Sequence, residues 1–189
     1  MVSDMEVPTY LLFILGVLGG LDVLFFHSIA HGIRHHSDAR TELILHSLRG
    51  PVYGLLFWIV PNVMLLGAYW WALVGVLTID FLITVFDFAV ERRSREKLGG
   101  LPTVEYILHL LMAVVFGAFV MAIWSGTTGW RAFPSSISYS PANVWWPIRA
   151  LALMAISVIV SGLLDVVAAH RLSLISNEDR RGSGKHVAG

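Results

Sequence analysis

The sequence reads Glu42-Leu-Ile-Leu-His46-Ser-Leu-Arg-Gly-Pro-Val-Tyr-Gly54, and 63 positions later it reads Glu105-Tyr-Ile-Leu-His109-Leu-Leu-Met-Ala-Val-Val-Phe-Gly117. Seven of the thirteen aligned positions are identical, and two of these identities are a glutamate and a histidine four residues apart. Residues at this spacing lie on one face of a helix. The duplicated acid–imidazole pair therefore predicts four ligands of a metal site, arranged with pseudo-symmetry.

The composition around this repeat is that of a membrane protein. Of 189 residues, 56% are hydrophobic and only 14% are charged, which is more apolar surface than a soluble domain of this size can bury. The formal net charge is zero, so we expect no nucleic-acid partner. The chain has no cysteine, which excludes disulfides, thiolate zinc sites and iron–sulfur clusters.

Five stretches are apolar over the roughly 20 residues that a helix needs to cross a bilayer. The predicted spans are Val7–Phe26, two crossings within Leu43–Val90 with a turn inside Pro61–Trp71, then Val104–Trp124 and Trp146–Ala169. Residues 1–8 carry no lysine or arginine, so the first span is expected to be retained rather than cleaved as a signal peptide. Residues 1–176 are predicted to form one five-helix domain, and residues 177–189 a mobile polar tail.

The basic residues predict the orientation of the spans. Eleven of the 13 lysines and arginines fall after span one, after span three or in the tail, so these segments are expected in the cytoplasm and the N-terminus outside. Tryptophans mark the opposite ends of the spans, and Ser125–Asn143 is expected to form a loop or lid on that outer side. The chain is predicted to be integral to the bacterial inner membrane, in contact with lipid.

Every predicted span brings an acid or a histidine to about the same depth near the cytoplasmic leaflet. Ionisable groups inside a bilayer are costly and usually face the interior of a helix bundle. Span by span these residues are Asp22, His27, His31, His35 and His36; Glu42 and His46; Asp87 and Glu91; Glu105 and His109; and Asp165 and His170. An Asp-Val-x3-His pattern at Asp22 and Asp165, with a shorter variant at Asp87, extends the repeat and predicts that spans one–two and three–four are a duplicated helix pair.

Nine of these residues are predicted metal ligands: His27, His31, Glu42, His46, Asp87, Glu91, Glu105, His109 and Asp165. The spacing of His27, His31 and His35 by four predicts one stripe along a helix. The set is large enough for two metal ions, for which iron is the first choice and zinc the second. It is similar in kind to carboxylate-bridged di-iron bundles, which place a Glu-x2-His pair on each of two helices, although the x3 spacing and the transmembrane setting differ.

The first functional hypothesis is a membrane di-metal oxidoreductase, an all-α bundle acting on a small apolar substrate such as a lipid or quinone. Glu42 and Glu105 would be its catalytic carboxylates, and a quinone or a partner protein would exchange electrons with it. Three alternatives remain open: a zinc-dependent intramembrane hydrolase, a haem b carrier with His46 and His109 on the iron, and a metal or proton transporter.

Plainer interpretations exist for several of these residues. The acids of the repeat could be present only because a carboxylate is favourable at the positive, N-terminal end of a helix dipole. Asp87 and Glu91 could simply pair with arginines. Asp22 and Asp80, which lie deeper in their spans, are interpreted as protonated acids or as a proton relay. Arg49 has no basic counterpart in the repeat and is interpreted as ordinary cytoplasmic-side charge. Five glycines predict close helix packing, namely Gly16, Gly20, Gly50, Gly54 and Gly117.

Overall fold

The computed structural model describes residues 5–96, 100 and 102–186. For residues 92–95 and 176–186 it describes the backbone and not the side chains. Within these residues five helices are long and apolar enough to cross a membrane. The α-helices of these five segments are α1 (Glu6–Asp22), α2 (Arg40–Asn62), α3 (Trp70–Arg95), α4 (Thr103–Thr127) and α5 (Trp145–His186). The number of apolar helices is thus as predicted. Residues 97–99 and 101 of the predicted loop after span three, and residues 187–189 of the predicted tail, lie outside the described part.

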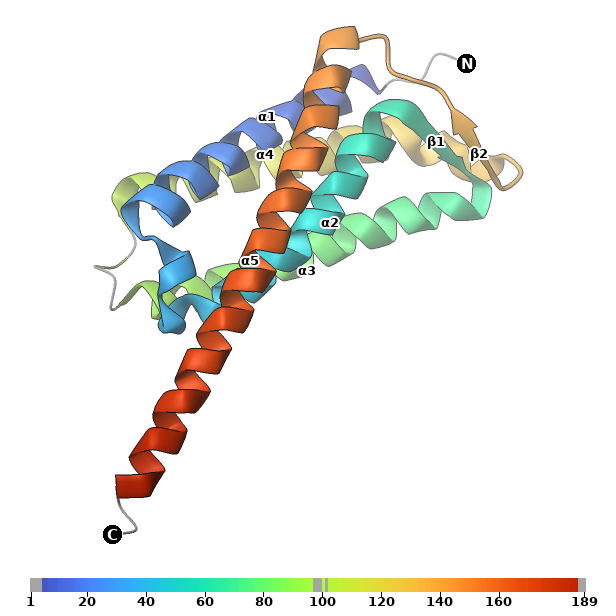
Figure 1. Cartoon of the computed structure of the whole chain (residues 1–189). Helices are drawn as coiled ribbons and strands as arrows, with labels where there is room; N and C mark the ends of the chain where they lie inside the picture. The colour runs from blue at the N-terminus through green and yellow to red at the C-terminus, as the bar shows by residue number, and fades with distance from the viewer. Residues whose placement is uncertain (1–4, 97–99, 101, 187–189) are drawn as a thin grey trace.

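The helices pack in pairs along the bundle. The α1 helix lies along α4, while α2 lies between α3 and α5 (Figure 1). The last helix runs on beyond the others, so residues 177–186 of the predicted tail continue α5 (Figure 1). Many apolar side chains on the outer faces are exposed, and Val104, Ile107 and Leu110 of α4 are each more than half exposed. Such a surface, on five helices long and apolar enough to cross a membrane, hints at an integral membrane protein.

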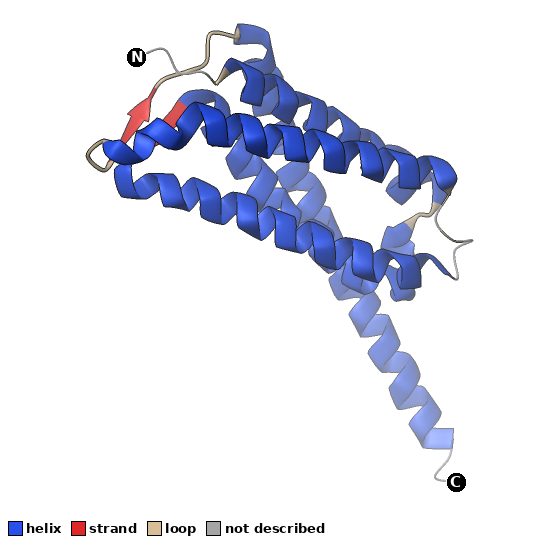
Figure 2. Ribbon diagram, turned by 180° about the vertical axis from the view of Figure 1, so that it is seen from behind, coloured by secondary structure: helices blue, strands red, loops and turns tan. Residues whose placement is uncertain are grey.

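A two-stranded antiparallel sheet closes one end of the bundle. The strand β1 (Val63–Leu66) follows α2 directly, within the turn predicted for residues 61–71, and pairs with β2 (Ser136–Tyr139) so that Met64 is opposite Ser138. Figure 2 shows the strands at the end opposite the start of α4. The segment predicted as a loop or lid, residues 125–143, therefore contains the end of α4 and a strand. Hydrogen bonds between its backbone and β1 order residues 136–139 of this segment. The polar composition of the segment did not predict that pairing.

Glycines allow the backbones of α2 and α5 to come into direct contact. A Cβ atom on Gly50 would lie 3.0 Å from the carbonyl oxygen of Val158 and 3.4 Å from the Cα of Gly162. Gly54 meets Ile159 one turn later, and Gly16 of α1 meets Met154 and Phe57. Gly20 and Gly117 have no atom within 4 Å of the same position, so close packing there was wrongly expected.

The two classes of glycine should respond oppositely to alanine. We expect Gly50→Ala to lower the stability of the protein by about 1–3 kcal/mol, because the new methyl group meets backbone that cannot move aside. Gly117→Ala should be neutral or stabilising by up to ~1 kcal/mol, because it meets nothing and favours the helix. Thermal unfolding midpoints in one detergent measure both, and an equal response of the two variants would contradict the packing described here.

Candidate metal centre

The four residues of the repeat meet at the end of the bundle where α1 ends and α2 and α4 begin. Glu42 and Glu105 have 0% of their surface exposed, and His109 has 8%. The His46 side chain is 11% exposed. Each of these residues lies within the first two turns of its helix, so the same offset in α2 and α4 brings both pairs to the same level. The prediction that the two acid–imidazole pairs come together is confirmed.

The first span adds His27 through an unusual helical winding. Beyond α1 the chain continues as a π-helix over Val23–Ala30, and the amide of His31 donates to the carbonyl of Phe26 at 2.9 Å. In an α-helix, Asp22 and His27 would point about 140° apart. The wider winding turns them to one face, where His27 Nε2 lies 3.3 Å from Asp22 Oδ2. π-Helical turns inside α-helices are frequent at functional sites.

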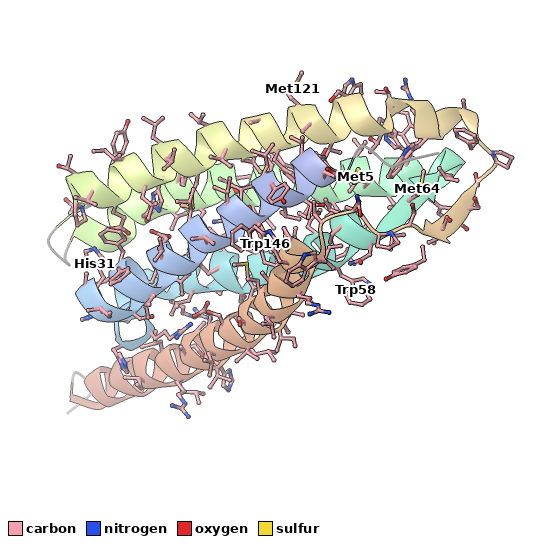
Figure 3. The ribbon with its side chains drawn as sticks, turned by 90° about the horizontal axis from the view of Figure 1, so that it is seen from above. Met5, His31, Trp58, Met64, Met121 and Trp146 are labelled. Carbon is pink, nitrogen blue, oxygen red and sulfur yellow. The ribbon has the colours of Figure 1, made fainter. Side chains whose placement is uncertain are left out.

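The helix does not continue to His35. Gly32 has a φ of 55°, in the left-handed region that glycine tolerates, and the chain then turns through two short 3₁₀ segments into α2. His35 and His36 are exposed as a result, so the predicted stripe of His27, His31 and His35 is wrong at its last member. His31, which is labelled in Figure 3, lies at the end of the first span. Its Nε2 atom lies 3.1 Å from Glu105 Oε2.

Three overlapping groups of side chains have ligand atoms within 4.8 Å of one another. They are His27 with Glu42 and His46, Asp22 with Glu105 and His109, and His27 with Glu91 and Glu105. Two residues, His27 and Glu105, occur in two groups each, and their Nε2 and Oε1 atoms are 4.0 Å apart. The groups therefore form one continuous cluster.

The two histidines of the repeat have equivalent partners. His46 Nε2 lies 3.3 Å from Asp87 Oδ2, and His109 Nε2 lies 3.3 Å from Asp22 Oδ1. Each imidazole thus faces an aspartate from the odd-numbered helix of the other predicted pair. His109 also has Glu91 Oε2 at 3.3 Å from its Nδ1, and the ring of Phe88 stacks on it at 5.2 Å. Carboxylates beside both nitrogens fix the orientation of this ring.

Three predicted ligands lie outside these groups, namely His31, Asp87 and Asp165. Asp87 contacts His46 and also Arg49, whose Nη1 lies 3.6 Å from Asp87 Oδ2. Asp165 accepts a hydrogen bond of 2.7 Å from Arg34 Nε. Arg34 also donates to Ser161, so it ties α5 to the turn after α1. Ligation by Asp87 and Asp165 stays a prediction, and neither residue is needed for the three groups.

Asp22 is a member of the cluster that sequence reasoning did not include among the ligands. Its distance of five residues from His27 places it on the opposite side of an α-helix, so the pattern suggested a separate deep acid. The available signal was the Asp-Val-x3-His motif itself, which keeps its spacing at Asp165. Arg49 likewise differs from its interpretation as plain charge, because it contacts two buried carboxylates, Asp80 and Asp87.

The cluster is rich in buried acids. Seven acids are buried in the described part of the chain, and the described contacts place Arg34 beside Asp165 and Arg49 beside Asp80 and Asp87. The buried acids are Asp22, Glu42, Asp80, Asp87, Glu91, Glu105 and Asp165. Carboxylates inside an apolar bundle are very costly unless cations or protons compensate them.

Comparison of the chain with protein-family models, with curated proteins and with solved structures gave no match. The assignment of a function therefore depends on the cluster itself.

Proposed function

We propose that this cluster holds two metal ions and that the protein is a membrane oxidoreductase acting on an apolar substrate. One ion would bind His27, Glu42 and His46, and the other Asp22, Glu105 and His109. The observation that carries the proposal is the overlap of the ligand groups at His27 and Glu105, with ligand atoms within 4.8 Å in every group. The third group, in which Glu91 joins His27 and Glu105, contains one residue from each of the two sites and so brings the sites side by side.

The donor set is compatible with iron, the metal of carboxylate-bridged di-iron bundles. Four imidazoles and four carboxylates surround the cluster, namely His27, His31, His46, His109, Asp22, Glu42, Glu91 and Glu105. Such a mixture suits iron or manganese as well as zinc, and two ions with about four protein ligands each match the count in di-iron bundles. Two divalent cations would also compensate part of the negative charge of the buried acids.

The surroundings favour an apolar substrate. The centre is enclosed by side chains at 0–11% exposure, while the helices around it present exposed apolar residues such as Phe86 and Tyr106. A lipid-like or quinone-like molecule could approach from the bilayer, and a quinone or partner protein could take up the electrons. Glu42 and Glu105 would hold the ions as the two catalytic carboxylates. The buried surroundings of the centre would exclude competing water. The orientation of the spans and the duplication of the helix pair remain part of this proposal.

Haem is less compatible with the same residues. The rings of His27 and His46 lie 4.3 Å apart, and His109 has carboxylates beside both of its nitrogens. A porphyrin between His46 and His109 would have to displace these groups. Zinc remains the stronger alternative, because a zinc-bound water with a glutamate as general base would use the same ligands for hydrolysis.

Elemental analysis of the purified protein tests the proposal. We expect about two metal ions per chain, and His46→Ala and His109→Ala should each lose metal to a similar extent, because their surroundings are equivalent. His36→Ala is the matched control, since this histidine is exposed and should leave the metal content unchanged. A wild-type protein without iron, zinc, manganese or copper would refute the proposal. Zinc in a colourless, redox-inactive protein would select the hydrolase.

A further inference from the structure

A second buried polar group lies between α2 and α3, outside the three ligand groups of the metal centre. Asp80 has 0% of its surface exposed, and neither of its carboxylate oxygens has a hydrogen-bond partner among the described residues. It precedes Asp87 by seven residues, which is two helical turns or ~10 Å along α3. A buried carboxylate without a hydrogen bond is costly, so a ligand that donates a hydrogen bond to it gains affinity.

Two side chains of α2 interact with this carboxylate. Arg49 Nε lies 3.8 Å from Asp80 Oδ1, which is longer than a hydrogen bond. The guanidinium carbon of Arg49 lies 5.5 Å from the centre of the Tyr53 ring, and Tyr53 also interacts with Asp80. A hydrogen-bond acceptor, a guanidinium with several N–H donors and a phenol therefore come together at one place inside the bundle.

An apolar hollow of about 70 Å³ lies next to this polar group, between the same two helices. Val76 lines it and precedes Asp80 by four residues, which is one turn of α3, and Leu56 lines it from α2. Leu55 and Ala72 also line it and are exposed, so the hollow opens on the apolar outer surface of the bundle. An apolar chain can enter it from a bilayer and leave its polar head beside Asp80.

The polar groups restrict the chemistry of that head. A hydroxyl group can donate to Asp80 and accept from Arg49 at the same time. A carboxylate head would bring a third negative charge to Arg49, which already lies beside Asp80 and Asp87. An aromatic ring on the hydroxyl adds favourable contacts with the Tyr53 ring and the guanidinium. A phenolic ring with an apolar tail fits these requirements better than a fatty acid or a hydrocarbon.

We propose that Asp80, Arg49 and Tyr53 bind the ring of a quinol, the reduced form of the quinone that takes up electrons from the metal centre. One ring hydroxyl donates to Asp80 and accepts from Arg49, and the tail lies in the hollow. Arg49 Nη1 lies 3.6 Å from Asp87 Oδ2, and Asp87 Oδ2 lies 3.3 Å from His46 Nε2. These side chains connect the ring to the centre, so the quinone need not reach the buried ligands.

The reaction balances with the two ions of the centre. The quinone takes up two electrons, one from each metal ion, and two protons from water, and both of its carbonyl groups become hydroxyl groups. The electron transfer rests on the proposed function, because it needs a redox-active centre. The binding of the quinol needs only the side chains between α2 and α3.

Equilibrium binding to the metal-loaded protein in lipid nanodiscs tests the site. The probe is a decyl-tailed benzoquinol kept reduced with dithionite, and empty nanodiscs correct for partition into lipid. We expect saturable binding, with 1-decanol at least ~10-fold weaker and decanoate weaker still, since neither has an aromatic ring. Asp80→Ala should weaken quinol binding ~10-fold or more, because a hydrogen bond to a charged group is lost.

Thr78→Ala is the matched control on the same helix, because Thr78 is exposed and its hydroxyl donates to the carbonyl of Val74. It should leave quinol binding unchanged. Ala72→Phe covers the case in which Asp80→Ala does not fold. The added ring fills the hollow, so the decyl-tailed quinol should bind at least ~10-fold more weakly while tail-free benzoquinol binds as before. Ala113→Phe, at an exposed alanine of α4, should change neither.

The results separate the site from the metal centre. Quinol that binds Asp80→Ala as tightly as wild type, or that binds wild type no more tightly than 1-decanol does, would overturn the inference. So would an equal affinity of the decyl-tailed quinol for Ala72→Phe and wild type. A metal-free wild type that still binds quinol refutes the metal centre and keeps the binding site. A full metal complement without saturable quinol binding refutes the binding site alone.

Discussion

Replacing Glu105 by alanine is expected to remove both metal ions from the purified protein, whereas Glu42→Ala should remove about one. Glu105 belongs to two of the three ligand groups and Glu42 to one. Its two oxygens reach different histidines, with Oε2 at 3.1 Å from His31 and Oε1 at 4.0 Å from His27. Without this carboxylate the group around His109 loses a ligand and the link to His27 is broken.

Glu42→Ala serves as an internal control for Glu105→Ala, because both glutamates have 0% exposure and precede a histidine of the repeat by four residues. The result is the number of metal ions per chain, measured by elemental analysis. Circular dichroism should show that the compared variants have the same helix content. Glu105→Gln keeps the shape of the side chain and covers the case in which the alanine variant does not fold. Glu6→Ala, at an exposed glutamate of α1, should retain all metal. Equal losses from Glu42→Ala and Glu105→Ala would show that the two halves do not share a ligand.

The architecture was largely predictable from the sequence, because the length of an apolar run directly measures how far a helix can extend in a membrane. The turn between the second and third spans fell where residues 61–71 predicted it. The start of β2 at Ser136 was not predictable, since Ser136 pairs with Leu66 of a four-residue strand, 70 positions earlier in the sequence. Pairing of this kind depends on tertiary context rather than on local preference.

The site was predictable where it depends on the repeat and less so where it depends on backbone winding. Glu42 and Glu105 met because an identical offset in two helices gives an identical depth. His35 was misplaced because Gly32 ends the helix, and Asp22 was missed because a π-helix changes which residues share a face. Neither feature follows from hydrophobic periodicity. Gly54 and Gly117 add a second limit, since identical residues of the repeat pack differently when α5 packs against α2 at Gly54 and nothing lies within 4 Å of a Cβ atom at Gly117.

Removal of metal is expected to reverse the effect of one substitution on stability. In the metal-loaded protein, Glu42→Gln should lower the free energy of unfolding by about 1–3 kcal/mol, because the neutral amide is a poorer ligand and leaves a buried cation less well compensated. In protein stripped by a chelator, the same substitution should raise stability, because it removes one negative charge from a buried cluster in which several carboxylates lie close together. Thermal midpoints of both proteins, with and without chelator, give the four values required.

This change of sign separates a metal ligand from a glutamate that only stabilises the fold. A carboxylate that caps a helix or pairs with a histidine loses the same interaction in both conditions, so its replacement by glutamine would destabilise both states alike. A ligand is stabilising only while its cation is present, and repulsion among the buried carboxylates makes each of them unfavourable once the metal has gone. Glu6→Gln, at the exposed start of α1, should shift neither midpoint. A loss of stability in both states for Glu42→Gln would mean that protons, rather than metal ions, balance the buried acids.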